Sequence, residues 1–330
     1  MAKIKVAING FGRIGRAFLK ESWENDELEV VAVNDLGNVD NMAYLLKYDT
    51  VYKTWKHEVK AEGGNLVIDG RTIKFVSEKE PLKLPWKDLG VDVVVESTGL
   101  FTDFEKAAVH IEAGAKKVVI SAPAKGGEGK GETILMGVNE EKFGTCDVTS
   151  NASCTTNAAS PLIAILDENF GIEKAILNTV HGYTASQALV DGPSKKDLRE
   201  GRAAAQNIVP SSTGAAIAVT KAFTKLEGLF DGISIRVPVP AGSIVDVTFI
   251  SKKNTTAEEV NNVLREQAKT DRWKKIFSAT DEELVSSDIL GSHFGSIADL
   301  KMTRVVGGNL IKVMAWYDNV NKHWGKLKHT

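Results

Sequence analysis

The stretch "INGFGRIGR", residues 8–16, constrains the fold of this chain more than any other. Its glycines Gly10, Gly12 and Gly15 have the G-x-G-x-x-G spacing, and they stand between an apolar run that predicts a strand and a pattern that predicts a helix. In that context the first glycine permits a tight turn, the second lets a pyrophosphate approach the backbone, and the third allows close helix packing. The motif therefore predicts a dinucleotide site at a helix N-terminus.

An acidic residue follows at the distance that such a site requires. Asp35 ends the next predicted strand, about twenty residues after Gly15, where a carboxylate can accept hydrogen bonds from an adenosine ribose. Leu36 and Gly37 come next, and no arginine stands nearby to receive a 2′-phosphate. The sequence therefore predicts NAD rather than NADP as the cofactor.

Strand and helix patterns alternate up to about residue 150. The strand-like runs are apolar and rich in β-branched residues, as in "KIKVAING", "LEVVAVND", "VDVVVEST" and "KKVVISAP", and helical patterns separate them. This alternation predicts an α/β fold, a Rossmann-type doubly wound parallel sheet with helices on both faces. Residues 57–76 differ, because turns at "EGGN" and "IDGR" predict β-hairpins there.

The second half of the chain predicts an α+β catalytic domain. A helix through "NAASPLIAILDENFG" leads to the strand "IEKAILNTVHGY" and then to a polar loop, residues 185–208, that is too long for a mere connection. Further strands are predicted in "GISIRVPVP", "SIVDVTFIS" and "MTRVVGGNLIKVMAWYD". We expect an NAD-binding domain over residues 1–152 and a catalytic domain over 153–316, with the tail, about 317–330, returning to the first domain.

Composition excludes several classes of protein. The 330 residues are 43% hydrophobic and 25% charged, as in ordinary globular proteins, and the net charge is −2. This balance indicates no partner among nucleic acids or anionic membranes, and no apolar run is long enough for a signal peptide or a membrane span. Two cysteines and no export signal favour the cytoplasm. Their spacing does not suit zinc, so we expect no metal site.

Small polar side chains, rather than apolar ones, surround the cysteine in "SNASCTTNAASP". Cys154 stands where a helix should begin, and Ser153 and Thr155 or Thr156 are available to cap that helix. A thiol reacts as the thiolate, which a helix N-terminus or a neighbouring histidine stabilises. His181 closes a predicted strand and opens the long loop, a position typical of catalytic side chains. The pattern alone leaves two interpretations equally open, a catalytic Cys–His pair and a capped helix with an incidental cysteine.

Several longer stretches resemble one family. "SNASCTTN", "ESTGLF", "RVPVP", "WYDN", the segment from "HGYTASQ" to "SSTGAA", and "INGFGRIGR" with "NDL" are similar to phosphorylating glyceraldehyde-3-phosphate dehydrogenases, in register from residue 3 to about residue 319. The resemblance implies an NAD-dependent glycolytic enzyme that converts D-glyceraldehyde 3-phosphate and inorganic phosphate to 1,3-bisphosphoglycerate. It implies that Cys154 attacks the aldehyde, that His181 acts as base, and that phosphate releases a thioester from the cysteine.

The resemblance also implies binding residues and an assembly. One anion site would comprise Ser153, Thr155, Thr213 and Gly214, and a second would comprise Thr184 and Arg236. Besides the three glycines and Asp35, the cofactor would contact Arg13, Ile14, Lys79, which replaces a usual arginine near the adenine, Ser121 and Asn319. A homotetramer is implied, in which the long loop reaches toward the cofactor of a neighbouring subunit.

Two other functions stay open. An erythrose-4-phosphate dehydrogenase would use the same cysteine and histidine but end in hydrolysis, and an intact phosphate site favours the phosphorylating enzyme. A non-catalytic NAD-binding protein would not need Cys154, His181 and Arg236 together. The chain departs from the family pattern after "WYDN", where the tail "VNKHWGKLKHT" places His323 or Lys326 at the position of an expected tyrosine.

Overall fold

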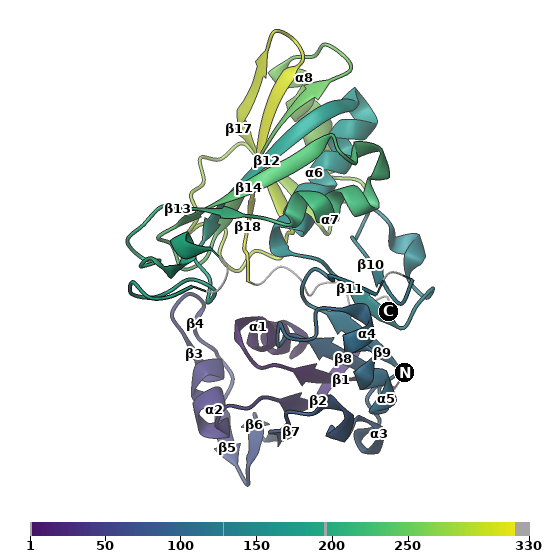
Figure 1. The fold of residues 1–330 in the computed structure, drawn as a ribbon, viewed down its shortest axis with the longest axis vertical. Coiled ribbons are helices and arrows are strands. Elements are labelled where there is room, and N and C mark those ends of the chain that lie inside the picture. The colour runs from purple at the N-terminus through teal and green to yellow at the C-terminus, as the bar shows by residue number, and fades with distance from the viewer. Residues whose placement is uncertain (1, 128, 195–196, 321–330) are drawn as a thin grey trace. The chain divides into compact units, whose positions relative to one another are not determined.

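The computed structural model describes residues 2–127, 129–194 and 197–320, which form two compact units (Figure 1). Unit 1 contains the described residues up to Ile134 together with Glu141–Ala152, and unit 2 contains Leu135–Glu140 together with the described residues from Ser153 onward. Residues 317–320 therefore belong to unit 2. The rest of the predicted tail, including His323 and Lys326, lies outside the described residues.

The described residues of unit 1 form a nine-stranded sheet in the order β10-β11-β9-β8-β1-β2-β7-β6-β5. All neighbours from β10 to β7 pair in parallel. These strands are β1 (Ile4–Asn9), β2 (Leu28–Asn34), β7 (Arg71–Val76), β8 (Val93–Glu96), β9 (Lys117–Ile120), β10 (Glu132–Thr133) and β11 (Val148–Ser150). The strand order reverses at β1, and in such sheets ligands bind at the carboxyl ends of the strands beside that point.

Alternate residues of the central strands of unit 1 enter two separate cores. Val6 and Ile8 of β1 pack with α1 (Arg13–Ser22) and α2 (Val39–Lys47). Ala7 packs on the other face of the sheet with α3 (Trp86–Leu89), α4 (Phe104–Ala107) and α5 (Val109–Glu112). The predicted doubly wound parallel sheet is confirmed. The single helical pattern over residues 102–114 forms α4 and α5 separately, because the Ile111 N–H donates to the carbonyl of Ala108, only three residues back.

The two predicted hairpins are confirmed in β5 (Val59–Glu62), β6 (Asn65–Ile68) and β7. Their turns contain Gly64 and Gly70, whose φ angles of +75° and +78° are those that glycine adopts at little cost. β7 also pairs in parallel with β2, so the hairpins extend the main sheet. A further two-stranded sheet joins β3 (Tyr48–Asp49) to β4 (Lys53–Thr54).

Unit 2 is a seven-stranded mixed sheet over its described residues, in the order β13-β14-β12-β15-β18-β17-β16. The strands are β12 (Ile172–Gly182), β13 (Val209–Ser212), β14 (Phe230–Val237), β15 (Ser243–Ser251), β16 (Phe277–Thr280), β17 (Ser296–Val306) and β18 (Leu310–Tyr317). Three helices, α6 (Cys154–Phe170), α7 (Ala215–Ala222) and α8 (Ala257–Gln267), pack with the sheet around one core (Figure 1). The predicted α+β domain is confirmed, whereas β13 and β16 were not predicted. Among the described residues, no helix has the length and apolar character needed to cross a membrane.

Candidate active site

Cys154 is the first residue of α6, and the residue before it caps the helix. The Ser153 hydroxyl accepts a hydrogen bond of 3.0 Å from the backbone N–H of Thr156, as the sequence predicts for an N-cap. The same hydroxyl lies 2.7 Å from the Thr156 hydroxyl. The cap holds the thiol at the positive end of the helix dipole, where a thiolate is favoured.

The structure brings Cys154 and His181 together. The Cys154 sulfur lies 3.3 Å from Nε2 of His181, within hydrogen-bonding distance. His181 is the second-last residue of β12 and is 4% exposed, so its ring is held by the sheet rather than by the long loop that follows. The geometry is that of an activated nucleophile and its base.

Arg236 lies beside His181, because β12 and β14 pair in parallel with these two residues in register. Its Nη1 is 2.6 Å from Nδ1 of His181, and the same Nδ1 is 2.6 Å from the carbonyl oxygen of Gly182. Nδ1 can serve only one of these partners at a time. When protonated it donates to Gly182 and leaves Nε2 to accept the thiol proton, and when unprotonated it accepts from Arg236 and Nε2–H points at the sulfur.

Tyr317, which the sequence reasoning did not single out, joins the elements under this pair. Its hydroxyl lies 2.8 Å from the Thr155 hydroxyl and 2.7 Å from the Thr179 hydroxyl. Burial raises the pKa of Tyr317 well above its usual value, and the nearby Cys154 raises it further. The phenol therefore stays protonated and links α6 to β12 through β18. The sequence gives one signal for this role, a tyrosine at an inward-facing position of a predicted strand. A buried tyrosine hydroxyl needs a hydrogen-bond partner, so such a residue is expected to bridge neighbouring elements.

The residues predicted to bind anions lie at the ends of these same elements. Thr155 is buried, and its hydroxyl is held by Tyr317. Thr213 accepts a 3.2 Å hydrogen bond from the N–H of Ala215, and Gly214 is the N-cap of α7, which packs against α6. Thr184 follows β12 by two residues, and its hydroxyl lies 3.1 Å from that of Ser186. Their anion-binding roles stay predictions.

The glycine turn of unit 1 has the geometry that its motif predicts. Gly10 has a φ of +93°, and a Cβ on it would lie 2.6 Å from the backbone nitrogen of Thr98. A Cβ on Gly15 would collide with the carbonyl oxygen of Gly10. A Cβ on Gly12 would meet no atom of the described residues within 4 Å. The protein itself therefore requires the first and third glycines, whereas the second leaves open space at the N-terminus of α1.

Asp35 connects this turn to the end of β2. One carboxylate oxygen accepts a 2.7 Å hydrogen bond from the N–H of Phe11, and the other accepts a 2.8 Å hydrogen bond from the N–H of Gly37. Each oxygen keeps further acceptor capacity for a ribose hydroxyl. Open space at a helix N-terminus and an adjacent carboxylate suit a dinucleotide at the carboxyl end of the parallel sheet.

The other predicted cofactor residues of unit 1 are placed at strand and helix ends. Arg13 and Ile14 open α1, and the guanidinium of Arg13 lies 3.2 Å from the carboxylate of Asp49. Lys79 is exposed beyond β7. Ser121 follows β9, and its N–H donates to the carbonyl of Glu96 at 2.9 Å.

Asn319 belongs to unit 2 and has a fixed amide orientation. Its side-chain oxygen accepts hydrogen bonds from the N–H of Gly242 at 2.9 Å and from the hydroxyl of Ser243 at 3.1 Å. These two hydrogen bonds orient the amide, so that its NH2 group can donate to a carbonyl group of a ligand. That donor suits the predicted contact with a nicotinamide carboxamide.

Comparison with known proteins gives consistent matches over nearly the whole chain. Residues 4–104 match the model of the glyceraldehyde 3-phosphate dehydrogenase NAD-binding domain, and residues 153–319 match that of the C-terminal domain. Glyceraldehyde-3-phosphate dehydrogenase B of Aspergillus oryzae is 46% identical over 97% of this chain and 94% of its own length. The glyceraldehyde-3-phosphate dehydrogenase of Clostridium pasteurianum is 46% identical over 99% of this chain and 97% of its own length. A chloroplastic form from Pisum sativum is 49% identical over 98% of this chain and 72% of its own length.

Proposed function

Because this chain belongs to the glyceraldehyde-3-phosphate dehydrogenase family, we propose that Cys154 is the nucleophile of its reaction and His181 the general base. The chain is an NAD-dependent oxidoreductase that converts D-glyceraldehyde 3-phosphate and inorganic phosphate to 1,3-bisphosphoglycerate. The observation that carries the assignment is the 3.3 Å distance between the Cys154 sulfur and Nε2 of His181. NAD, when bound, supplies the acceptor for a hydride.

The two residues act in two half-reactions. In the first, Nε2 of His181 takes the thiol proton of Cys154 and gives it to the aldehyde oxygen as the sulfur bonds to the aldehyde carbon. His181 takes the proton of this hydroxyl back as the hydride leaves the same carbon. The product is a thioester on Cys154. In the second, a phosphate oxygen bonds to the thioester carbon and the carbon–sulfur bond breaks, which releases the acyl phosphate and restores the thiolate. Sulfur suits this role because an oxygen ester would be a poorer acyl donor.

The two predicted anion sites supply the phosphate contacts of these steps. We assign Arg236 and Thr184 to the phosphate of the substrate, and the N-terminus of α6 with Ser153 to the attacking inorganic phosphate. Since Tyr317 holds the Thr155 hydroxyl, Thr155 contributes through its backbone N–H in the first turn of α6. Thr213 and Gly214 likewise contribute backbone N–H groups to the inorganic phosphate, at the N-terminus of α7.

Arg236 has a second role in this proposal. A bound substrate phosphate attracts its guanidinium away from Nδ1 of His181, since a doubly charged anion is a stronger acceptor than a neutral imidazole. Nδ1–H then donates to the carbonyl of Gly182, which lies 2.6 Å away, and Nε2 is left as the proton acceptor. Substrate binding thereby selects the tautomer that a general base requires.

NADH formation from different sugar phosphates tests the function. We expect turnover of glyceraldehyde 3-phosphate that depends on inorganic phosphate. Phosphate-independent turnover of erythrose 4-phosphate would instead identify an erythrose-4-phosphate dehydrogenase. NAD binding without turnover of either sugar would identify a non-catalytic NAD-binding protein.

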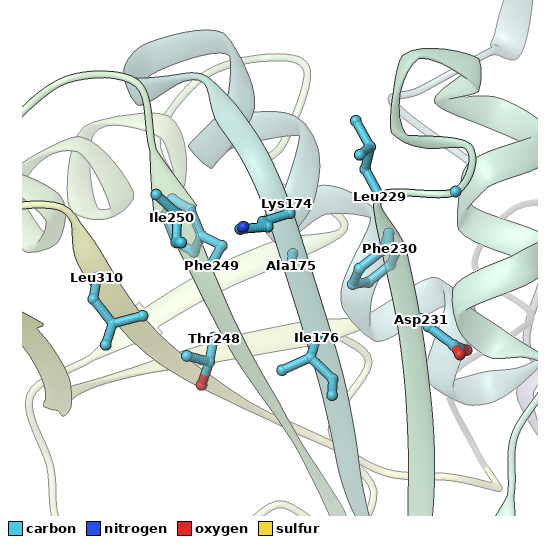
Figure 2. Close-up of a pocket in the computed structure, with 11 residues that line it drawn as sticks. Lys174, Ala175, Ile176, Leu229, Phe230, Asp231, Thr248, Phe249, Ile250 and Leu310 are labelled. Carbon is cyan, nitrogen blue, oxygen red and sulfur yellow. The ribbon is translucent and has the colours of Figure 1, made fainter.

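A homotetramer is part of the proposal, and two exposed apolar surfaces support it. On the sheet face of unit 2 that points away from the helices, Ile176, Thr248 and Leu310 lie on three neighbouring strands beside a hollow of about 430 Å³ (Figure 2). Ile176 is 57% exposed there. In the loop after His181, four aliphatic side chains are exposed by between 71% and 85%: Leu189, Val190, Leu198 and Ile208. Large exposed apolar patches mark protein interfaces, and two separate self-complementary faces are what a symmetric tetramer of identical chains needs.

The domain roles and the compartment complete the proposal. We assign NAD binding to residues 1–152 and catalysis to residues 153–316, and we place residues 317–320 with the catalytic unit to which they belong. Cys146 and Cys154 form no disulfide bond among the described residues, which suits a reducing compartment, and we propose the cytoplasm. Fractionation of the source cells tests this, because recovery in a plastid would contradict it.

A further inference from the structure

Five buried polar or aromatic side chains form a connected cluster under the glycine turn of unit 1. They stand at the ends of three parallel strands and on two helices: Asn9 of β1, Asn34 of β2, Glu96 of β8, Trp86 of α3 and His110 of α5. None is more than 5% exposed. The reaction described above assigns no step to any of them. Buried polar groups are costly unless they are paired, so their mutual contacts indicate what the cluster does.

Glu96 is the centre of this cluster. One of its carboxylate oxygens accepts hydrogen bonds from Nδ2 of Asn9 at 2.6 Å and from Nε2 of His110 at 3.1 Å. The other accepts from the N–H of Thr98 at 2.8 Å and from the Thr98 hydroxyl. Four donors on two oxygens satisfy a buried carboxylate.

Trp86 determines which nitrogen of His110 carries the proton. The indole N–H of Trp86, which can only donate, lies 3.1 Å from Nδ1 of His110. Nδ1 must therefore be the unprotonated acceptor, and Nε2 carries the proton that it donates to Glu96. His110 is thus a neutral bridge between Trp86 and the carboxylate.

Asn9, Ser97 and Thr98 connect the cluster to the glycine turn. Asn9 directly precedes Gly10, and its side-chain oxygen accepts a 2.7 Å hydrogen bond from Asn34. Ser97, which follows Glu96, donates from its hydroxyl to the carbonyl of Gly10 at 3.1 Å. The Thr98 backbone packs so closely against Gly10 that a Cβ there would lie 2.6 Å from its nitrogen. Glu96 therefore holds both the strand that enters the turn and the loop against which the turn packs.

We propose that His110 is a positioning residue for NAD, which acts through Glu96 to hold the glycine turn in its binding conformation. The inference rests on the NAD site proposed above and adds to it a residue that touches neither cofactor nor substrate. Without the Nε2–H donor, Glu96 has one unfilled acceptor position in a buried site and draws on Asn9 or Thr98 to fill it. The turn then samples more conformations, and NAD binding must restore order at a cost in affinity.

The test compares His110→Leu with His110→Gln. Leucine removes both hydrogen bonds, whereas a glutamine amide can donate to Glu96 and accept from Trp86. We expect His110→Leu to raise the Kd and KM for NAD about tenfold, the effect of losing roughly one hydrogen bond to a charged group, and to leave kcat at saturating NAD unchanged. His110→Gln should restore the affinity to within about twofold of the wild type, as measured by calorimetry.

A matched core variant separates positioning from general stability. Ile68→Ala removes buried volume on the opposite face of the sheet, away from the cluster, and should lower thermal stability without changing the Kd for NAD. Equal loss of affinity in both variants, or no loss in His110→Leu, overturns the inference. Wild-type protein that does not bind NAD would contradict the proposed function instead.

A second variant keeps the test usable if His110→Leu does not fold. Trp86→Phe removes the donor to Nδ1 without touching Glu96. We expect it to raise the KM for NAD by a smaller factor, about threefold, and to abolish the single Nε2–H tautomer of His110 in ¹⁵N NMR spectra. An unchanged KM and an unchanged tautomer would both contradict the proposal.

Discussion

At the scale of single residues, Asp35 shows that one side chain can serve the fold and a ligand together. Its carboxylate accepts the N–H groups of Phe11 and Gly37 and thereby ties the glycine turn to the loop after β2. The same oxygens keep acceptor capacity for the adenosine ribose that the motif predicts. Replacing Asp35 therefore changes two things, the shape of the turn and the direct ribose contact.

The two effects can be separated by comparing cofactors. Asp35→Ala should raise the Kd for NAD by about tenfold or more, because both the ribose contact and the ordered turn are lost. The loss for NADP should be smaller, since removing the carboxylate also removes its repulsion of the 2′-phosphate. Titration of the variant with both cofactors measures this. Equal losses would mean that Asp35 acts on the turn alone.

The nucleophile assignment is tested by exchanging sulfur for oxygen. Cys154→Ser should bind NAD with unchanged affinity but release no burst of NADH from glyceraldehyde 3-phosphate, because a serine hydroxyl is ionised far less readily than a thiol. Cys146→Ser is the matched control, since its sulfur donates a 3.3 Å hydrogen bond to the carbonyl of Val148, which a hydroxyl can replace. A burst from the Cys154 variant would refute the assignment.

At the scale of elements, α1 depends on its glycines for two different reasons. Gly15 sits where the helix packs directly against the carbonyl of Gly10, so a side chain there displaces the helix. Gly12 faces open space among the described residues, and its φ of −64° is accessible to any amino acid. One glycine thus serves packing, and the other leaves room for a ligand.

The two glycines should therefore give opposite results on substitution to alanine. Gly12→Ala should keep the thermal stability of the wild type and raise the Kd for NAD at least tenfold, because its methyl group occupies the space of the pyrophosphate. Gly15→Ala should lower the free energy of unfolding by roughly 1–3 kcal/mol, the usual cost of overpacking. Thermal unfolding with and without NAD measures both. Unchanged NAD affinity in Gly12→Ala would contradict binding of the pyrophosphate at this turn.

At the scale of the whole molecule, the sheet of unit 2 has one face covered by helices and one exposed face, where Ile176, Ile233 and Leu310 stand among polar side chains. Leu177 of β12 is buried on the covered side, whereas its neighbour Ile176 is 57% exposed. Exposed aliphatic side chains gathered on one face are typical of a surface that a partner covers. We assigned that partner to a second copy of the chain.

A charge on this face should disrupt the assembly. Ile176→Glu should shift the particle from a tetramer toward smaller species, because an interface related by two-fold symmetry brings two copies of the new charge close together. Leu82→Glu is the control, since Leu82 is 59% exposed in unit 1. Light scattering at several protein concentrations measures the mass. A tetramer that survives the substitution at Ile176 would contradict the interface, and a monomeric wild type would contradict the assembly.

The sequence by itself determined the features that depend on neighbours in the chain. Periodicity predicted the parallel sheet. Local turn and cap signals predicted the hairpins, the glycine turn at Gly10 and the cap at Ser153, because turns and caps are formed by residues a few positions apart. The strands β13 (Val209–Ser212) and β16 (Phe277–Thr280) escaped prediction. Both are only four residues long, so their own sequence patterns are too short to predict a strand. They form strands because they pair with neighbouring strands of the unit 2 sheet.

Only the tertiary structure decided the contacts between distant residues. His181 and Arg236 meet because β12 and β14 are in register, although 55 positions separate them. Tyr317 meets Thr155 across 162 positions. His110 has no pattern that distinguishes it from a histidine on a solvent-exposed helix face, yet it lies fully buried against Glu96. Such contacts follow from strand order and register, which no local sequence signal encodes, and they decide which polar side chains act together.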